Sequence, residues 1–155
     1  MKTLRKATLH DAPALWDLRI QAIEHQCAAH YAPDLIQIWT AGSVTPQFGA
    51  LVAEHFYLIE ENGKIVASGM IDLSSGKIDA IFVAPKHFRQ GYGAQMLDHL
   101  ETLARAAGLP QLHLDATLNA AAFYRTRGFC GDAVAQYHSP RGIVLDCVPM
   151  TKRLA

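Results

Sequence analysis

The sequence predicts a mixed α and β domain on three observations: the length of the chain, its balanced composition, and an alternation of helix-type and strand-type hydrophobic patterns. At 155 residues and 17.0 kDa, the chain has the size of one ordinary domain with a sizeable core. No internal repeat or low-complexity tract indicates a second domain. We therefore expect a single domain over residues 1–155.

The composition argues against several classes of protein. Half of the residues are hydrophobic, 18% are charged, and 14 basic residues balance 14 acidic ones, so neither disorder nor a nucleic-acid partner is expected. The three cysteines lie far apart and form no C-x-x-C pair, which argues against a disulfide framework and against structural zinc. No apolar run reaches the ~18 residues that span a bilayer, and the first residues lack the apolar stretch of a secretion signal. These features favour a cytoplasmic protein without a membrane partner.

The first third of the chain is predicted to be mainly helical. Residues 3–8 fit a short edge strand, and Asp11 is placed to cap the helix that follows it. A second helix is expected over about 33–39, where a proline and an aspartate open the pattern. Turn residues crowd positions 41–46, and the amphipathic stretch after them fits no single period until strands begin at His55.

The middle of the chain predicts a meander of three strands. The segments FYLIEE and KIVASGMIDL flank Asn62-Gly63, the dipeptide that best accommodates the positive φ angles of a two-residue hairpin turn. A second turn at 74–76 leads into KIDAIFV. Pro85 ends that strand because proline cannot donate to a ladder.

The last third again mixes both element types. Apolar residues recur at three- and four-residue steps over 91–107, which predicts a long helix that Gly108 ends. The elements expected after it are a strand over 111–116, a helix from about Asn119 to Arg127, and two strands around Val134 and Val144 joined through Ser139-Pro140-Arg141-Gly142.

The segment VAPKHFRQGYGAQML passes from a strand through a glycine-containing loop into a helix, and this arrangement binds anions. The first N–H groups of a helix are unpaired, the helix dipole is positive there, and Gly91 and Gly93 let a phosphate approach the backbone. Two glycines that merely ease a tight turn are the alternative. The chain contains no G-x-x-x-x-G-K-[ST] string, and a dinucleotide fingerprint would need a small residue at Met96.

Two motifs in order resemble the GCN5-related N-acetyltransferase (GNAT) superfamily. Val83-Ala84-Pro85 followed by Phe88-Arg89-Gln90-Gly91-Tyr92-Gly93 resembles its acetyl-CoA loop, although Phe88 stands where the family usually has Arg or Gln. The downstream LDATLNAAAFYRTRGF resembles its second signature, and VPMTKRL resembles the last strand of many relatives. YAPDLIQIW resembles an aromatic-rich helix in one bacterial branch of small-molecule acetyltransferases. The resemblance implies a mostly antiparallel, twisted sheet of six to seven strands flanked by about four helices.

The resemblance also implies a function, namely transfer of an acetyl group from the cosubstrate acetyl-CoA to an amine of a small molecule or peptide, without a metal. A backbone N–H on the strand edge at 81–83 would stabilise the oxyanion, and Tyr124 would protonate the leaving thiolate. Core packing is the alternative role for Tyr124. The residues implied to contact CoA are Ile81, Phe82, Val83, Arg89, Gln90, Gly91, Tyr92, Gly93, Ala94, Thr117, Asn119 and Tyr124.

Two of these positions carry a second interpretation. Asn119 fits either a helix cap or a contact with the pantetheine arm, and Thr117 occupies the commonest asparagine position of the family. Lys86, His87 and Arg89 are placed to meet the nucleotide phosphate, although solvated charge is their ordinary role.

The general base is open between three residues. An alkylamine with a pKa of ~10.4 lies about 3.4 units above pH 7, so its deprotonation costs about 4.6 kcal/mol and needs an acceptor for the proton. Asp79, on the strand that leads to the oxyanion edge, is our candidate. Asp115 and His113 share one face of the next strand, and either could act directly or through water.

The acceptor site carries no recognisable sequence code. Tyr31, Trp39 and Tyr137 could line an aromatic pocket, and core packing is the alternative for each. The spacing of His25, Cys27 and His30 does not place all three on one helix face, so no metal site is expected. Homodimers are common in the superfamily. A CoA-binding sensor or scaffold without turnover is the alternative function.

Overall fold

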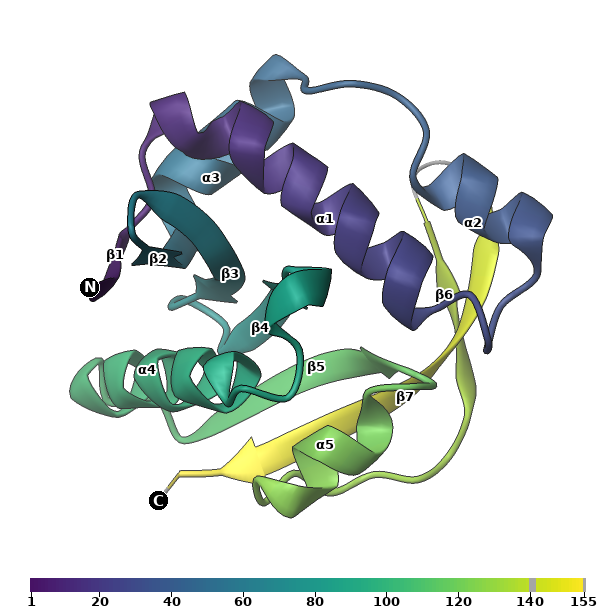
Figure 1. Ribbon diagram of the computed structural model, residues 1–155. Coiled ribbons are helices and arrows are strands. Elements are labelled where there is room, and N and C mark those ends of the chain that lie inside the picture. The colour runs from purple at the N-terminus through teal and green to yellow at the C-terminus, as the bar shows by residue number, and fades with distance from the viewer. Residues whose placement is uncertain (140–141, 155) are drawn as a thin grey trace.

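The computed structural model describes residues 1–139 and 142–154, and these form one seven-stranded sheet with helices on both faces (Figure 1). The strands are β1 (Lys2–Lys6), β2 (Phe56–Glu61), β3 (Lys64–Asp72), β4 (Lys77–Val83), β5 (Gln111–Thr117), β6 (Ala135–His138) and β7 (Val144–Arg153). The helices are α1 (Ala12–Gln26), α2 (Pro33–Trp39), α3 (Pro46–His55), α4 (Tyr92–Ala106) and α5 (Ala121–Thr126), with short 3₁₀ turns η1 (Leu9–Asp11) and η2 (Pro85–His87).

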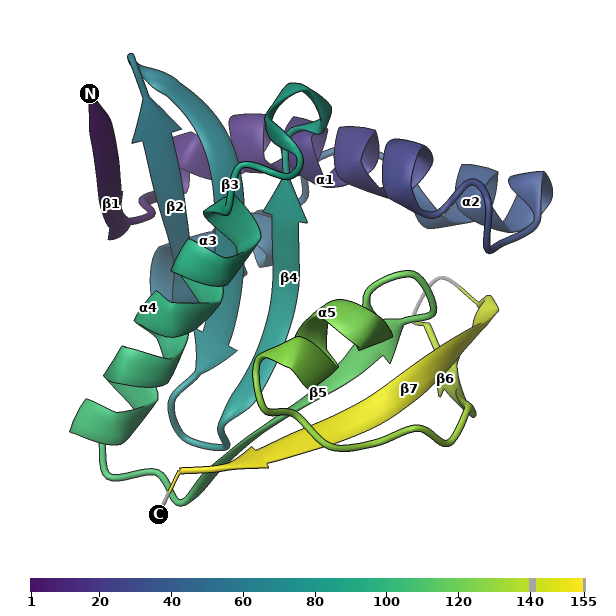
Figure 2. The ribbon, with the colours of Figure 1, turned by 60° about the horizontal axis from the view of Figure 1, so that its bottom comes forward.

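The sheet has the order β1-β2-β3-β4-β5-β7-β6, and all neighbours are antiparallel except β4 and β5. Helices α1 and α3 cover one face of the first four strands, and α4 covers the other face (Figures 1 and 2). The expected fold class and sheet are thus confirmed. The described residues contain five α-helices where the sequence indicated about four, because the ambiguous stretch after residue 46 forms α3.

The strands β4 and β5 are paired only at one end, and the opening between them positions the site. Their ladder consists of one pair, Lys77 with His113, and the two strands then diverge, as Figure 2 shows. The pairing of β3 with β4 also shifts register between Ser68 and Met70, opposite Ala80, whose φ is 55°. The buried hydroxyl of Ser68 donates to the carbonyl of Ala80 at 3.2 Å and supports this bulge.

Local predictions in the first half are mostly confirmed. The hairpin between β2 and β3 turns at Asn62 and Gly63 with φ angles of 53° and 80°, as its dipeptide requires. The edge strand is β1, although it ends at Lys6. The first two helices stand where the pattern placed them.

The capping role given to Asp11 was wrong. Its side chain makes no cap hydrogen bond to α1. The carboxylate instead accepts the N–H of Thr8 at 2.7 Å and forms an ion pair with Arg5 at 2.9 Å. The Arg5 guanidinium thereby lowers the pKa of Asp11 to about 2. The residue therefore ties the start of the helix to the edge strand.

The second half needed smaller corrections. Helix α4 has the predicted extent and ends before Gly108. Helix α5 begins at Ala121 rather than at Asn119, because Ala120 is its N-cap. Val134 is 62% exposed and precedes β6. The predicted turn through Ser139-Pro140-Arg141-Gly142 falls partly on Pro140 and Arg141, which lie outside the described residues.

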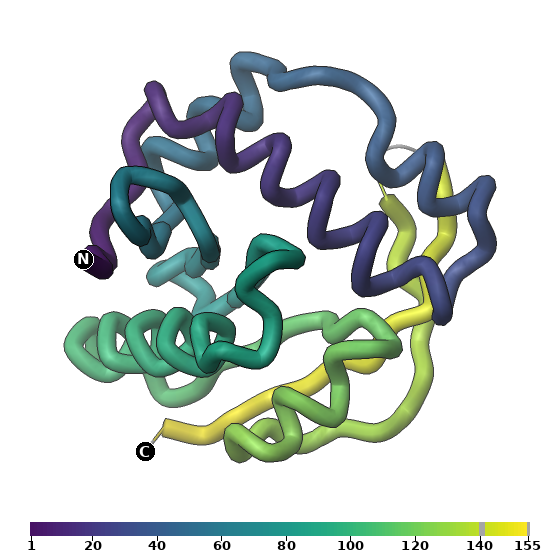
Figure 3. The backbone as a smooth tube through the Cα atoms, viewed as in Figure 1, coloured from purple at the N-terminus to yellow at the C-terminus, as the bar shows by residue number. Residues whose placement is uncertain are grey.

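Segments far apart in the sequence meet at one end of the molecule. The connection between α1 and α2 lies beside the β6–β7 hairpin, as the tube in Figure 3 shows. The hydroxyl of Tyr31 donates to the carbonyl of Asp146 and accepts the N–H of Leu118 at 3.1 Å. This contact joins the helical first third to the last two strands. No helix among the described residues is long and apolar enough to cross a bilayer.

Candidate active site

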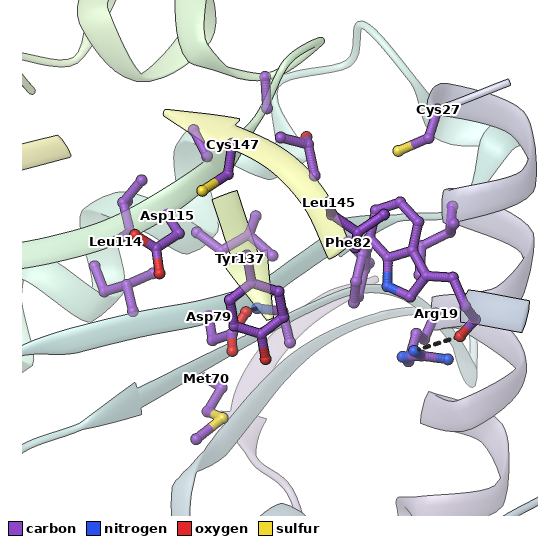
Figure 4. Close-up of a pocket in the computed structure, with 18 of the residues that line it drawn as sticks. Arg19, Cys27, Met70, Asp79, Phe82, Leu114, Asp115, Tyr137, Leu145 and Cys147 are labelled. Atoms are coloured by element: carbon purple, nitrogen blue, oxygen red, sulfur yellow. Dashed lines mark hydrogen bonds between the residues drawn. The ribbon is translucent and has the colours of Figure 1, made fainter. Parts of the chain in front are cut away.

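A cavity of about 370 Å³ occupies the space where β4 and β5 diverge. Its walls come mainly from β4 and β5 and from the β6–β7 hairpin, with further side chains from α1, α2, α3, α5, β2 and β3. Figure 4 shows Asp79, Asp115 and Tyr137 gathered at one end, and Arg19 at the other. Most of the lining surface is apolar, with a few charged groups set into it. Such a composition suits a small-molecule site.

Asp79 lies on β4 with its carboxyl in this cavity. The side chain stays accessible through the cavity, but protein atoms surround it on its other sides, and this desolvation raises the pKa of its carboxyl. One oxygen accepts the N–H of Ala80 at 2.8 Å, which partly opposes the rise. A carboxylate with a raised pKa holds a proton more strongly than ordinary aspartate, so it can act as a general base.

Tyr124 lies on α5 and lines the same cavity. It is 8% exposed, and its ring packs against Phe123 and Phe129 at centroid distances of 5.2 and 5.7 Å. Burial raises the pKa of its hydroxyl, and the charge of Asp79 adds to the effect. The hydroxyl therefore stays protonated. The structure brings Tyr124 and Asp79 together, and the packing role and the site role coexist in one residue.

The edge of β4 that faces the cavity offers backbone donors. The N–H of Ala84 donates to Val66 on β3 at 2.8 Å, and Phe82 pairs with Ser68 on the same strand. Because N–H groups alternate along a strand, those of Ile81 and Val83 point away from β3, toward the gap left by β5. Ile81 and Phe82 also line the cavity. These donors can receive a carbonyl oxygen.

The predicted phosphate loop leads into α4 beside this edge. Gly91 is the N-cap with a φ of 85°, and no side chain caps the helix. The first internal bond of the helix runs from the N–H of Gln95 to Gly91, so the N–H groups of residues 92–94 remain for a ligand. A Cβ at Gly91 would meet no atom within 4 Å, so the loop is open to an incoming group at this point. Arg89 and Gln90 are exposed on the same loop.

Side chains hold the loop in place from behind. Tyr92 is 2% exposed and turns away from the loop surface, so only its backbone is offered there. Its hydroxyl donates to Glu61 at 2.8 Å, and His87 lies 3.5 Å from the same carboxylate. Both ends of the loop are therefore tied to β2. Phe88, at the position that departs from the family pattern, packs on the ring of His25 at 5.2 Å.

The remaining predicted residues lie at different distances from the cavity. Thr117 lines it, whereas Asn119 accepts a hydrogen bond from the thiol of Cys27 at 3.4 Å. Asp115 lines the cavity and forms an ion pair with Lys77 at 2.9 Å. His113 lies 3.2 Å from the carbonyl of Ser75, at the closed end of the strand pair. Asp79 is thus better placed for a general base than either alternative.

The predicted aromatic pocket residues all line the cavity, namely Tyr31, Trp39 and Tyr137. The hydroxyl end of Tyr137 points toward Asp79 in Figure 4. Among residues 1–139 and 142–154, no group of three or more His, Cys, Asp or Glu side chains is arranged to hold a metal ion.

Sequence reasoning missed Arg19 and Glu61. Arg19 lies on the inward side of α1, four residues after buried Leu15 and four before buried Ile23. A charged residue at a helical spacing that is otherwise apolar is a readable signal for a functional position. Glu61 ends a strand at a hairpin, and no local pattern marks its contact with Tyr92 thirty-one residues later.

Curated relatives match part of the chain. An amino-acid acetyltransferase from Pseudomonas fluorescens (strain Pf0-1) is 32% identical over 92 residues, which are 57% of this chain. One from Pseudomonas putida is 29% identical over 92 residues. The aligned region covers 21% of each of these two relatives.

Solved structures match the whole fold. A GCN5-related N-acetyltransferase from Rhodopseudomonas palustris has a TM-score of 0.91 at 26% identity, over 99% of this chain and 96% of that one. The ribosomal-protein-S18-alanine N-acetyltransferase from Escherichia coli has a TM-score of 0.72 at 22% identity, over 100% and 95% of the two chains. N-acetylglutamate synthase from Neisseria gonorrhoeae, solved with coenzyme A and N-acetyl-glutamate, has a TM-score of 0.68 at 19% identity, over 100% and 35%.

The family itself follows from a direct match. The model of the acetyltransferase (GNAT) family matches residues 21–129, which is more than half of the chain and includes the strand β4, the phosphate loop and Tyr124. The chain therefore belongs to the acetyltransferase (GNAT) family.

Proposed function

We propose that this chain is an N-acetyltransferase that moves the acetyl group of acetyl-CoA to a primary amine of a small molecule or peptide. The observation that carries the proposal is the position of one cavity, which lies at the open edge of β4 and contains Asp79 and Tyr124. The anion-binding start of α4 follows the same strand. Relatives named for amino-acid and ribosomal-protein-alanine acetylation support an amine acceptor.

The donor half of the site fits CoA. In this proposal the N–H groups at the start of α4 bind the pyrophosphate, with Arg89 and Gln90 beside it. The pantetheine arm then lies in the gap between β4 and β5, near Thr117. The N–H of Ile81 or Val83 receives the thioester oxygen at the exposed edge of β4.

The transfer step uses the groups that face the cavity. Asp79 accepts a proton from the acceptor ammonium, directly or through water, and releases it to solvent, so that the nitrogen lone pair is available and the carboxylate is restored. The nitrogen attacks the thioester carbon, a C–N bond forms, and the β4 N–H groups stabilise the oxyanion of the tetrahedral intermediate. The C–S bond then breaks, and Tyr124 donates a hydrogen bond to the departing sulfur. The nitrogen of the intermediate still carries a second proton, which Asp79 accepts as the C–S bond breaks. That proton reaches the thiolate through the Tyr124 hydroxyl, which leaves an amide and free CoA.

We also propose a domain organisation and a cellular location for the chain. The described chain acts as one acetyltransferase domain. Its three cysteines are free thiols, which fits a reducing cytoplasm. A homodimer is compatible with the fold.

Calorimetric titration with acetyl-CoA, CoA and ATP tests the donor site. We expect micromolar binding of both CoA species and at least about 100-fold weaker binding by Gly91→Glu, because a carboxylate would stand where the phosphate binds. Gly108→Glu is the matched control, since Gly108 also has a positive φ, 76°, and open space, at the other end of α4. Its affinity should stay within about threefold of the parent.

Release of free thiol with a panel of amines then tests turnover. Turnover with any amine supports the enzyme. Binding of acetyl-CoA without turnover of any amine favours the sensor or scaffold function, and no binding of either CoA species overturns the proposal.

A further inference from the structure

The far end of the cavity from Asp79 is built around the guanidinium of Arg19. This residue lies on the inward side of α1 and lines the cavity. Its Nη2 donates to the carbonyl of Trp39 at 2.8 Å, and its guanidinium carbon lies 4.8 Å from the ring centroid of Trp16. These contacts hold the planar group between α1 and the end of α2. Figure 4 shows Arg19 across the cavity from Asp79 and Tyr137.

The charges of the cavity are arranged with opposite signs at its two ends. Arg19 and Lys77 are the cations among the described lining residues, and Lys77 forms its ion pair with Asp115 near Asp79. Arg19 is separated from this group by Phe82 and Leu145 in Figure 4. Burial raises the pKa of Asp79, and the positive charge of Arg19 weakly opposes this rise, so the two ends are within electrostatic range of each other.

The wall between the two ends is apolar. Phe82 and Leu145 line it. Trp39, whose carbonyl accepts the hydrogen bond from Arg19, lines the cavity at the Arg19 end. An acceptor that spans the cavity therefore meets a carboxylate, an apolar wall and a guanidinium in that order. A guanidinium stays charged at every relevant pH, and its fork of donors matches a carboxylate. An acceptor without an anionic group would remove water from this cation without offering it a charge-assisted hydrogen bond.

We infer that Arg19 binds a carboxylate of the acceptor, so that the acceptor is an aminocarboxylate whose amine and carboxylate are separated by an apolar segment. This inference rests on the proposed acetyltransferase function. The amine lies at Asp79, where the proton leaves, and the carboxylate lies at Arg19. A peptide amine without a nearby carboxylate is a poorer acceptor.

Matched pairs of acceptors test the inference. 5-Aminopentanoate and 6-aminohexanoate are compared with the corresponding amides, and β-alanine and 4-aminobutyrate shorten the distance between amine and carboxylate. The quantity measured is the ratio of kcat/KM between parent and variant for each acceptor, so that differences in amine basicity cancel. Arg19→Met removes the charge, Arg19→Lys keeps it without the planar fork, and Lys64→Met removes a positive charge from an exposed position outside the cavity.

We expect Arg19→Met to lose about 100-fold in kcat/KM with the carboxylate acceptors and less than about threefold with the amides. Arg19→Lys should fall between, and Lys64→Met should match the parent. Equal losses for acids and amides, or a parent enzyme that prefers the amides, would overturn the inference.

A binding measurement covers the case in which no acceptor of the panel turns over. Calorimetry of the CoA-loaded protein with 3-phenylpropionate and 3-phenylpropionamide should show binding of the acid alone, and Arg19→Met should abolish it. No preference for the acid contradicts the inference. Titration of each variant with acetyl-CoA reports the donor site separately, so failure of the proposed function is distinguishable from failure of the carboxylate site.

Discussion

The two halves of the cavity recognise their ligands by different means. The donor half offers mainly backbone groups, namely the N–H groups at the start of α4 and the open edge of β4. The acceptor half offers side chains from α1, α2, β4 and the β6–β7 hairpin. Backbone recognition depends on one local turn, whereas side-chain recognition depends on segments that only the folded chain brings together.

Each half of the cavity contains an unfavourable feature close to its ligand. In the donor loop, Arg89 has a φ of 64°, which is uncommon for a residue with a Cβ. In the acceptor half, Ala80 also has a positive φ, 55°, and the feature that bears on the reaction is the desolvated carboxyl of Asp79. Substitutions in the donor loop should therefore change the affinity for acetyl-CoA, and substitutions at Asp79 or Tyr124 should change the rate of transfer.

The largest effect on rate is expected from Tyr124→Phe. Loss of the hydroxyl removes the proton donor for the thiolate, so kcat should fall about 100-fold or more. The dissociation constant of CoA should stay within about threefold, because the ring keeps its contacts with Phe123 and Phe129. Tyr57→Phe, which removes a hydroxyl outside the cavity, is the control. Unchanged kcat in Tyr124→Phe would leave Tyr124 a packing residue only.

The next effect is expected from Asp79→Asn, which should lower kcat/KM about 10- to 100-fold. Below the raised pKa of Asp79, both the base and the amine of the acceptor lose activity by protonation, so log(kcat/KM) should rise with a slope near two. Above that pKa the slope should be near one. The variant should show a slope near one throughout. A parent profile without the steeper region would exclude Asp79 as the base.

Asp79→Asn, which should lower the activity, should increase the stability of the fold. The folded-state pKa of Asp79 is raised above 3.8, so the folded state binds the proton more tightly than the unfolded state does. The stability of the fold therefore falls as pH rises from the ordinary pKa of aspartate through the raised pKa of Asp79. At neutral pH the ionised carboxylate destabilises the folded state. Asp79→Asn should have a higher Tm than the parent at pH 7, and the difference should shrink toward pH 4. Thermal unfolding across this range measures it.

The contrast between the halves also explains what the sequence could predict. The hairpin at Asn62-Gly63, the long helix α4 and the loop at Gly91 each depend on residues that are neighbours in the chain, and each was predicted correctly. Asp11 was misread because its partner Arg5 lies on the edge strand rather than on the helix. Helix α3 was undecided because its buried side is short, with Gly49 and Val52.

The acceptor half was much harder to predict for the same reason. Tyr137 and Arg19 are more than a hundred residues apart, and their common cavity exists only because β5 diverges from β4. The single pair between those strands follows from tertiary packing, and no local residue pattern encodes it. Of these two residues, Arg19 carried a signal that the sequence could show, namely a charge at an inward helical position.

The smallest effect, and the sharpest test of the comparison, is expected from Tyr92→Phe in the donor half. The hydroxyl of Tyr92 bonds the carboxylate of Glu61, and this bond helps to hold both ends of the strained loop. Its loss should loosen the loop and raise the KM for acetyl-CoA about 3- to 10-fold without a change in kcat. Glu61→Gln, which keeps an acceptor for the hydroxyl but loses the charge beside His87, should raise KM by less. Tyr92 points away from the cavity, so its hydroxyl should not affect the transfer step. A fall in kcat with unchanged KM would therefore show that the donor loop also influences the rate, and that the two halves of the site do not act independently.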